Sequence, residues 1–246
     1  MIKIAPDLVR ELAPGGQLKA TINLGNVVLA QRHPQTGELG GVSVELAREL
    51  AMRLGVEAEL HPFETAGHAF KALQSGACDV GFLAIDPKRA EDLDYTAPYV
   101  IIEGTYMVAD ASPLREVEDV DREGVRIAAG ENTAYDLHLT RALSHAKLVR
   151  YPSSAVAIDA LFAGETDTVA GVRQALDQAL SKHPGFRVME GRFLVIEQAM
   201  ALPKHRPQAH AFLRDFIEEM KASGFIADAL ARSGQGEATV AGPALR

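Results

Sequence analysis

One arginine stands where a guanidinium could bind an anion in this 246-residue chain. Arg89 lies in "DVGFLAIDPKRAEDLDYTAPYV" (79–100), just after an apolar run that is typical of a buried strand. A guanidinium is planar, always charged, and presents paired N–H donors that match both oxygens of a carboxylate. The alternative is a solvated arginine that pairs with Asp86, Glu91 or Asp92, a role that contributes little at a surface.

The segment "GENTAYD" (130–136) is a second candidate for anion binding, because it lies between a predicted strand and a predicted helix. Asn132 or Thr133 can cap this helix with its side-chain oxygen. The N–H groups of a first helical turn form a site that favours negative charge. The alternative is a plain helix cap, and the two roles are compatible.

Motifs for catalysis or metal binding are not evident in the sequence. It contains no nucleophile elbow, no zinc-protease motif, no phosphate loop and no dinucleotide fingerprint. The eight histidines are scattered without completing a metal site, and the single Cys78 opens an apolar run that favours core packing. We therefore expect no catalytic residues, no metal and no cofactor.

Composition excludes several classes of partner. The chain has a net charge of −8, with 47% apolar and 24% charged residues, which is ordinary for a globular protein. The acidic balance argues against nucleic acid or an anionic membrane as the main partner. No run approaches the roughly 18 apolar residues of a membrane span, so no membrane insertion is expected. The first twenty residues lack the pattern of a signal peptide.

Alternating strands and helices predict an α/β protein with mainly parallel sheets. The helix predicted at 41–56 carries Val42, Leu46, Leu50 and Leu54 on one face, and Gly55 is placed to end it. The other predicted helices are 66–77, 133–143 and 154–165, and the predicted strands are 18–24, 57–63, 78–85, 124–130, 146–152 and 167–171.

The second half of the chain repeats the architecture of the first. "AIDALFAGETDTVAG" has the same order of features as "AFKALQSGACDVGFL": an apolar helix, a glycine, and an aspartate that opens a strand. This predicts two α/β lobes, with a ligand-binding site where the carboxyl ends of the strands face a crevice. A helical segment at 209–234, broken at Gly224, is expected on the first lobe, and residues 235–246 are predicted to fray.

Three segments resemble the family-3 bacterial extracellular solute-binding proteins, the receptors of polar amino-acid ABC transporters. They are "LGGVSVELARELAMRLGV", "ALQSGACDVGFLAIDPKRAEDLDYTAPYV" and "LFAGETDTVAG". The similarity runs from about residue 17 to 233. It implies a type II periplasmic-binding-protein fold whose lobes, 1–106 plus 200–246 and 107–199, are joined by crossings near "YMVAD" and "QAMALP". It also implies hinge closure over a small ligand, an ABC permease as partner and a periplasmic location; the missing signal peptide leaves a cytoplasmic location open.

The same resemblance suggests which residues bind the ligand. Arg89 occupies the position of the family's carboxylate-binding arginine, and "GENT" occupies that of a Gly-Thr or Gly-Ser that binds the same group. The family's Gly-x-Thr-x-Thr stretch before this arginine is absent, because the segment is two residues shorter. The family's aromatic positions fall at about Asn26 and at 65–67, so a stacking sandwich is not expected. Tyr99 is a further candidate, although core packing is the stronger expectation.

The position of the family's amino-group aspartate is also changed. It lies about five residues beyond Asp167, where this chain has Val172 and Arg173. An arginine would repel an ammonium, although Glu131, Glu197 or Glu103 could replace the missing carboxylate. The simpler interpretation is an anionic ligand without a free α-amino group, or one with a second acid group. The alternative is that Arg173 faces solvent on the following helix.

We therefore predict a solute-binding protein that captures a small anionic or zwitterionic metabolite, an amino acid or related organic acid. The alternative is an enzyme similar to the cyclohexadienyl dehydratases, which resemble the same family. In that case Glu131 or Glu197 would serve as a general acid that expels a leaving group from prephenate or arogenate.

Overall fold

The computed structural model describes residues 5–244, which form two compact units. Unit 1 comprises Met1–Ile101 and Glu197–Arg246, and unit 2 comprises Ile102–Ile196. The chain passes between the units inside two long strands, β6 (Leu93–Ala109) and β11 (Leu194–Pro203). These boundaries fall five and three residues before the predicted ones, so "YMVAD" lies wholly within unit 2.

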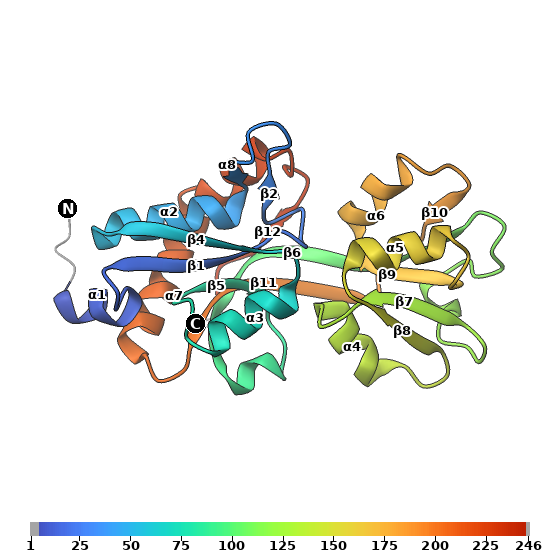
Figure 1. Cartoon of the computed structure of the whole chain (residues 1–246), viewed down its shortest axis with the longest axis horizontal. Coiled ribbons are helices and arrows are strands. Elements are labelled where there is room, and N and C mark those ends of the chain that lie inside the picture. The colour runs from blue at the N-terminus through green and yellow to red at the C-terminus, as the bar shows by residue number, and fades with distance from the viewer. Residues whose placement is uncertain (1–4, 245–246) are drawn as a thin grey trace. The chain divides into compact units, whose positions relative to one another are not determined.

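The strands β4, β1 and β5 of unit 1 lie in that order, and β5 is linked to the β1–β4 pair only through an isolated parallel bridge. β1 (Gln17–Asn23) pairs along its length with β4 (Glu57–Phe63), and Ala20 bridges Val80 just before β5 (Gly81–Ala84). Helix α2 (Val42–Leu54) connects β1 to β4, and α3 (Ala66–Gln74) connects β4 to β5. Because these crossovers run in opposite directions, their right-handedness places the two helices on opposite faces of the sheet (Figure 1).

The remaining elements of unit 1 complete its sheet and cover it. β5 pairs antiparallel with β11, and β12 (Thr239–Val240) pairs antiparallel with β6. The other helices are α1 (Pro6–Leu12), α7 (Pro207–Ala222) and α8 (Phe225–Arg232), and a short hairpin pairs β2 (Gln31–Arg32) with β3 (Leu39–Gly40). Gly224 separates α7 from α8 at a φ of +81°, as predicted. The prediction that 235–246 frays is wrong for β12, whose main chain is bound to β6.

Unit 2 repeats the crossover pattern. β7 (Arg126–Gly130) pairs in parallel with both β8 (Lys147–Tyr151) and β9 (Thr168–Val172). Helix α4 (Ala134–Ala142) connects β7 to β8, and α5 (Ser154–Phe162) connects β8 to β9, so they too cover opposite faces (Figure 1). β6 pairs antiparallel with β9 and with β10 (Phe186–Val188), and α6 (Arg173–Leu180) follows β9.

Each unit has its own apolar core. In unit 1, the predicted face of α2 is buried, and Gly55 ends the helix in the left-handed conformation. Cys78 is 1% exposed in a cluster with side chains of α3, β5 and β6, which confirms its packing role. Burial raises the pKa of this thiol to about 11, so the nucleophilic thiolate is disfavoured. In unit 2, side chains of β6, β7, α5, β9 and α6 form the core.

Candidate functional site

The carboxyl edge of the unit 1 sheet holds the first candidate residues. β1, β4 and β5 end there at Asn23, Phe63 and Ala84. The loops that follow β1 and β4 approach closely, because a Cβ added to Gly25 would lie 2.7 Å from the carbonyl oxygen of Glu64. The carboxyl edge of a parallel sheet is where ligands bind in α/β proteins. The close approach therefore fixes the loops at the edge where binding is expected.

Asn26 lies in the loop after β1 and is 7% exposed. The side-chain oxygen of Asn26 accepts a hydrogen bond from the backbone N–H of Val28 at 3.2 Å. The backbone N–H of Asn26 donates to the carbonyl oxygen of Asn23 at 3.4 Å. These contacts form a local turn in which an asparagine oxygen replaces a backbone acceptor. Asn26 thus shapes the loop, and its contact with a ligand stays a prediction.

Arg89 opens a short 3-10 helix (Arg89–Glu91) beyond β5 and is only 3% exposed. Its Nη1 donates to the carbonyl oxygen of Ala84 at 3.3 Å, and its guanidinium carbon lies 6.0 Å from the ring centroid of Phe70. Burial lowers the pKa of Arg89, while nearby Tyr95 and Asp86 oppose that shift. The interpretation of Arg89 as a solvated surface residue is therefore wrong. The fold holds this cation out of water at the end of a strand.

Two tyrosines of β6 lie in unit 1. The Tyr95 hydroxyl is buried without a hydrogen-bond partner among residues 5–244, and burial raises its pKa to about 12. Tyr99 is 0% exposed, and its hydroxyl lies 3.3 Å from the Ser43 Oγ of α2. Its ring meets that of Phe82 edge-on with centroids 6.3 Å apart. These contacts favour core packing for Tyr99, and its ligand contact stays a prediction.

The carboxyl edge of unit 2 has the same construction. β7, β8 and β9 end there at Gly130, Tyr151 and Val172. A Cβ added to Gly130 would lie 2.6 Å from the backbone nitrogen of Ser154 at the start of α5. In both units, then, a glycine lets the first loop of the edge pack directly on the backbone of the next.

Thr133 caps α4, as the sequence predicts. Its Oγ1 accepts from the backbone N–H of Asp136 at 3.1 Å and donates to the carbonyl oxygen of Gly130 at 2.9 Å. Asn132 has a φ of +57°, a conformation that asparagine tolerates better than most residues. Sequence reasoning missed Asp136, although an acidic residue in the first turn of a helix is favoured by the helix dipole.

Asp136 places a carboxylate at the start of α4. Its Oδ2 accepts from the backbone N–H of Asn132 at 2.8 Å, and its Oδ1 lies 2.8 Å from Nε of Arg150. The side chain is 4% exposed. A carboxylate of the chain itself therefore occupies part of the positive end of this helix. Ligand contact at Asn132 and Thr133 stays a prediction beyond the confirmed cap.

Arg173 begins α6 and is bound inside unit 2. Its Nε lies 3.1 Å from Oε2 of Glu103, and its Nη groups donate to the carbonyl oxygens of Met189, at 3.2 Å, and Gly191. Arg192 approaches the other oxygen of Glu103 at 2.5 Å. Hydrogen bonds from these two arginines, that of Arg192 first, lower the pKa of Glu103. The network joins β6, α6 and the loop before β11.

The two remaining glutamates have exposed side chains. Glu131 follows β7, and its backbone N–H donates to the carbonyl oxygen of Tyr151 at 2.8 Å. Glu197 lies on β11, and its carbonyl oxygen accepts from the N–H of Ile85 at 2.9 Å. The main chain at both positions is fixed by sheet contacts, while the carboxylates are available to solvent or to a ligand.

Neither a metal centre nor a membrane span is found in residues 5–244. No group of three or more His, Cys, Asp and Glu side chains in this range is arranged to hold a metal ion. No helix there has both the length and the apolar character that crossing a membrane requires.

Comparison with known proteins gives the family. The model of the bacterial extracellular solute-binding proteins, family 3, matches residues 30–234, a range that begins after the end of β1 and includes the carboxyl ends of the other parallel strands. The chain belongs to family 3. The resemblance seen in the sequence is thereby confirmed.

Individual proteins are similar to this chain at 20% to 27% identity. The L-cystine-binding protein TcyJ of Escherichia coli strain K12 is 27% identical over 195 residues, or 77% of this chain and 72% of that protein. The solved L-cysteine receptor of Neisseria gonorrhoeae is 21% identical, with a TM-score of 0.80 and 92% of each chain covered. The L-arginine-bound AbpA of Streptococcus pneumoniae is 20% identical, with a TM-score of 0.79 and coverage of 92% and 97%. These structures confirm the type II periplasmic-binding-protein fold.

The structure shows the surroundings of two positions at which the sequence departs from the expected family 3 pattern. Val172, at the place of the family's amino-group aspartate, is 9% exposed and is the N-cap residue of α6. Arg173 beside it is already paired with Glu103. The segment before Arg89 lacks the family's threonines, and there the carbonyl oxygen of Ala84 receives a guanidinium hydrogen bond. That the ligand contacts of this chain differ from the family pattern at these positions stays a prediction.

Proposed function

We propose that this family 3 protein is the receptor of an ABC transporter and captures a small carboxylate-bearing solute, an amino acid or a related organic acid. Family membership supports the receptor role. The names of the relatives support the ligand class, because cystine, cysteine and arginine are all small carboxylates. The family's description as extracellular supports work outside the cytoplasmic membrane, with an ABC permease as partner.

The observation that carries the proposal is the buried cation at the carboxyl edge of unit 1. Arg89 is 3% exposed, and burial opposes its charge. Keeping a desolvated guanidinium is costly unless negative charge and hydrogen-bond acceptors compensate. Asp86, which is 3% exposed, compensates part of this charge, and a ligand carboxylate would add two parallel charge-assisted hydrogen bonds. Arg89 is therefore the proposed anchor.

The other proposed ligand residues follow from the two carboxyl edges. Thr133 and Asn132 would add contacts from the start of α4, and Asn26 from the loop after β1. Their described hydrogen bonds hold the backbone of these loops in place, which favours a preformed loop at each edge. Tyr99 and Arg173 have packing and ion-pair roles that make direct contact a weaker proposal.

An amino group on the ligand would need a carboxylate other than the family's usual one. Glu131 and Glu197 are exposed and can receive an ammonium, whereas Glu103 is already bound by two arginines. The proposal thus includes two ligand types: an organic acid without an α-amino group, and an amino acid whose ammonium pairs with Glu131 or Glu197.

The dehydratase alternative has less support from the structure. A general acid works best where water is excluded. Both candidate acids, Glu131 and Glu197, have exposed side chains. Relatives named for binding rather than for catalysis point the same way.

A thermal-shift screen tests the proposal. The purified protein would be heated with amino acids (cystine, cysteine and arginine included), 2-keto acids, dicarboxylates and aromatic acids. We expect saturable stabilisation by one class, of about 2.7 kcal/mol at one hundred times Kd. In parallel, chromatography would follow prephenate and arogenate incubated with the protein, and both should remain intact. Absence of saturable stabilisation would oppose the receptor proposal, and consumption of either compound would favour the enzyme.

A further inference from the structure

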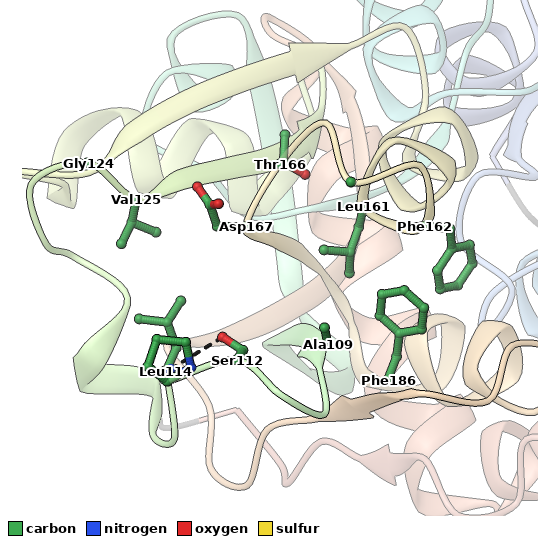
Figure 2. Close-up of a pocket in the computed structure, with 12 residues that line it drawn as sticks. Ala109, Ser112, Leu114, Gly124, Val125, Leu161, Phe162, Thr166, Asp167 and Phe186 are labelled. Carbon is green, nitrogen blue, oxygen red and sulfur yellow. Dashed lines mark hydrogen bonds between the residues drawn. The ribbon is translucent and has the colours of Figure 1, made fainter.

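A pocket of about 520 Å³ opens in unit 2 at the edge opposite the carboxyl ends of its parallel strands. Its walls come from the end of β6, the loop after it, the residues just before β7, the end of α5, the turn between α5 and β9, and β10 (Figure 2). The volume is within the range of small-molecule pockets. All twelve lining residues belong to unit 2, and none of them is among the residues proposed for the carboxylate site, so this pocket is distinct from that site.

The lining of this pocket is mainly apolar, and the apolar side chains come from several elements: Ala109, Pro113, Leu114, Val125, Leu161, Phe162 and Phe186. Two rings form one wall, because Phe162 and Phe186 meet edge-on with centroids 4.8 Å apart. None of the twelve lining residues is Lys, Arg or His. The only charged one is Asp167, which is paired with Arg126 at 3.0 Å. The lining therefore offers no cationic side chain to pair with an anion. It offers a large contact surface to an apolar ligand.

One polar group in the lining is left without a hydrogen bond. Thr166 is 4% exposed, and its Oγ1 is buried with no partner among residues 5–244. An unsatisfied buried hydroxyl costs about 1–3 kcal/mol, so such groups usually have a partner, a water or a ligand. Figure 2 shows Thr166 among the residues that ring the pocket. Its hydroxyl can serve as the orienting group of an otherwise apolar site.

The pocket is also held open by contacts outside it. Arg187 of β10 donates to the carbonyl oxygen of Leu114 and, at 3.5 Å, to that of Ser112, which fixes the loop that forms one wall. The Ser112 hydroxyl accepts from the N–H of Leu114 at 3.3 Å (Figure 2). On the opposite wall, Phe162 stacks on His183 at 4.0 Å. These contacts favour a preformed pocket rather than one that must open first.

We infer that this pocket binds a second, neutral ligand: a small molecule with an apolar body and one hydroxyl or carbonyl group that hydrogen-bonds to Thr166. The apolar walls bury the body, and the Thr166 hydroxyl gains the partner that the chain does not supply. Because no Lys, Arg or His lines the pocket, the carboxylates proposed for the other site are disfavoured here, and the two sites select different chemistry.

Methyl NMR with two probes tests this inference. The protein, labelled at Leu and Val methyls, is titrated with benzyl alcohol and with toluene, which have similar apolar bodies but differ in the hydroxyl. We expect saturable shifts centred on the methyls of Leu114, Val125 and Leu161. In Thr166→Val, which keeps the size of the side chain, benzyl alcohol should bind about fivefold more weakly while toluene is unaffected.

A pocket-filling variant and competition complete the test. Ala109→Leu should weaken both probes, because its side chain enters the space that they would occupy. A carboxylate found in the thermal-shift screen should not displace benzyl alcohol, and these results do not depend on whether such a carboxylate is found. Shifts that do not saturate, shifts spread over the whole unit, or equal loss of both probes in Thr166→Val would overturn the inference.

Discussion

Two arginines at equivalent places in the two units have opposite environments. Arg89 follows β5 and Arg173 follows β9, each at the carboxyl edge of its sheet. Arg89 is 3% exposed, and burial is the main influence on its pKa. The Arg173 side chain is 26% exposed and lies against the carboxylate of Glu103. One unit thus buries its arginine, whereas the other uses its arginine to join β6, α6 and the loop before β11.

This difference shows that residue type and position after a strand do not by themselves decide the role of an arginine. Each guanidinium has a carboxylate of its own unit nearby, Asp86 for Arg89 and Glu103 for Arg173, so burial is what separates the two. A guanidinium removed from water interacts more strongly with an incoming anion, because the local dielectric is low. The comparison therefore ranks Arg89 above Arg173 as a ligand residue.

The largest expected effect tests that ranking directly. With the carboxylate found in the thermal-shift screen, Arg89→Ala should lose about 2–5 kcal/mol of binding, or roughly thirtyfold to several thousandfold in Kd. Arg89→Lys, which keeps the charge but loses the planar fork, should fall between Arg89→Ala and the unaltered protein. Arg173→Ala should change Kd by less than about threefold, because its partner is Glu103. Isothermal titration calorimetry measures all three variants.

Equal losses of ligand affinity in Arg89→Ala and Arg173→Ala would contradict the ranking of Arg89 above Arg173. Unchanged affinity in Arg89→Ala would remove Arg89 from the site. Thermal unfolding without ligand shows whether each variant is folded at the temperature of the titration.

The sequence predicted the elements that depend on local pattern. The face of α2, the Gly55 end, the Gly224 break and β4 at Glu57–Phe63 all follow from periodicity and turn residues. The Thr133 cap was also predicted, because capping is a contact between near neighbours. The repeated order of strands and helices predicted the two units, although their boundaries differ by a few residues.

Features that depend on distant contacts were not predicted. The role of Arg173 is set by Glu103, seventy residues earlier in the chain, and by carbonyl oxygens of the loop before β11. The burial of Arg89 arises from packing that its acidic sequence neighbours do not indicate. The tail seemed loose in sequence, yet Thr239 and Val240 pair with Ile101 and Val100. Such contacts become visible only when the chain is folded.

The second prediction concerns the glycines that the two edges share. Gly25→Ala and Gly130→Ala each place a Cβ within 2.7 Å of backbone atoms that cannot rotate away. Overpacking of this kind costs about 1–3 kcal/mol. Gly15→Ala is the matched control, since nothing lies within 4 Å of its Cβ position and its φ is not in the left-handed range. Urea unfolding measures the free energy of each variant.

This pair of variants also tests the equivalence of the units. If both variants are destabilised relative to Gly15→Ala, the close approach of loops is a shared structural feature of the two edges. If Gly25→Ala or Gly130→Ala is as stable as the control, the loops of that unit tolerate separation, and the structural parallel between the edges fails.

The smallest effect concerns the ion pairs that bind Arg173. Hydrogen bonds from Arg192 and Arg173 lower the pKa of Glu103 below its ordinary value of 4.5. An acid whose pKa is lower in the folded state contributes stability above its unfolded pKa and loses it as pH falls through the folded one. Glu103→Gln should therefore lower the free energy of unfolding at pH 7, and the difference from the unaltered protein should shrink below about pH 4.5. Because the Glu103 side chain is 37% exposed, solvent screening limits the effect to about 0.5–1 kcal/mol.

Arg192→Ala provides the control for this network. Arg192 is 52% exposed and contacts only Glu103 among its described hydrogen-bond acceptors, whereas Arg173 also binds two carbonyl oxygens. Its removal should cost less than the removal of Glu103, with the same dependence on pH. Urea unfolding of both variants from pH 3.5 to 7.5 would show this. A pH-independent loss in Glu103→Gln would mean that packing rather than charge holds Arg173, and the proposed reason for its weak effect on ligand affinity would no longer stand.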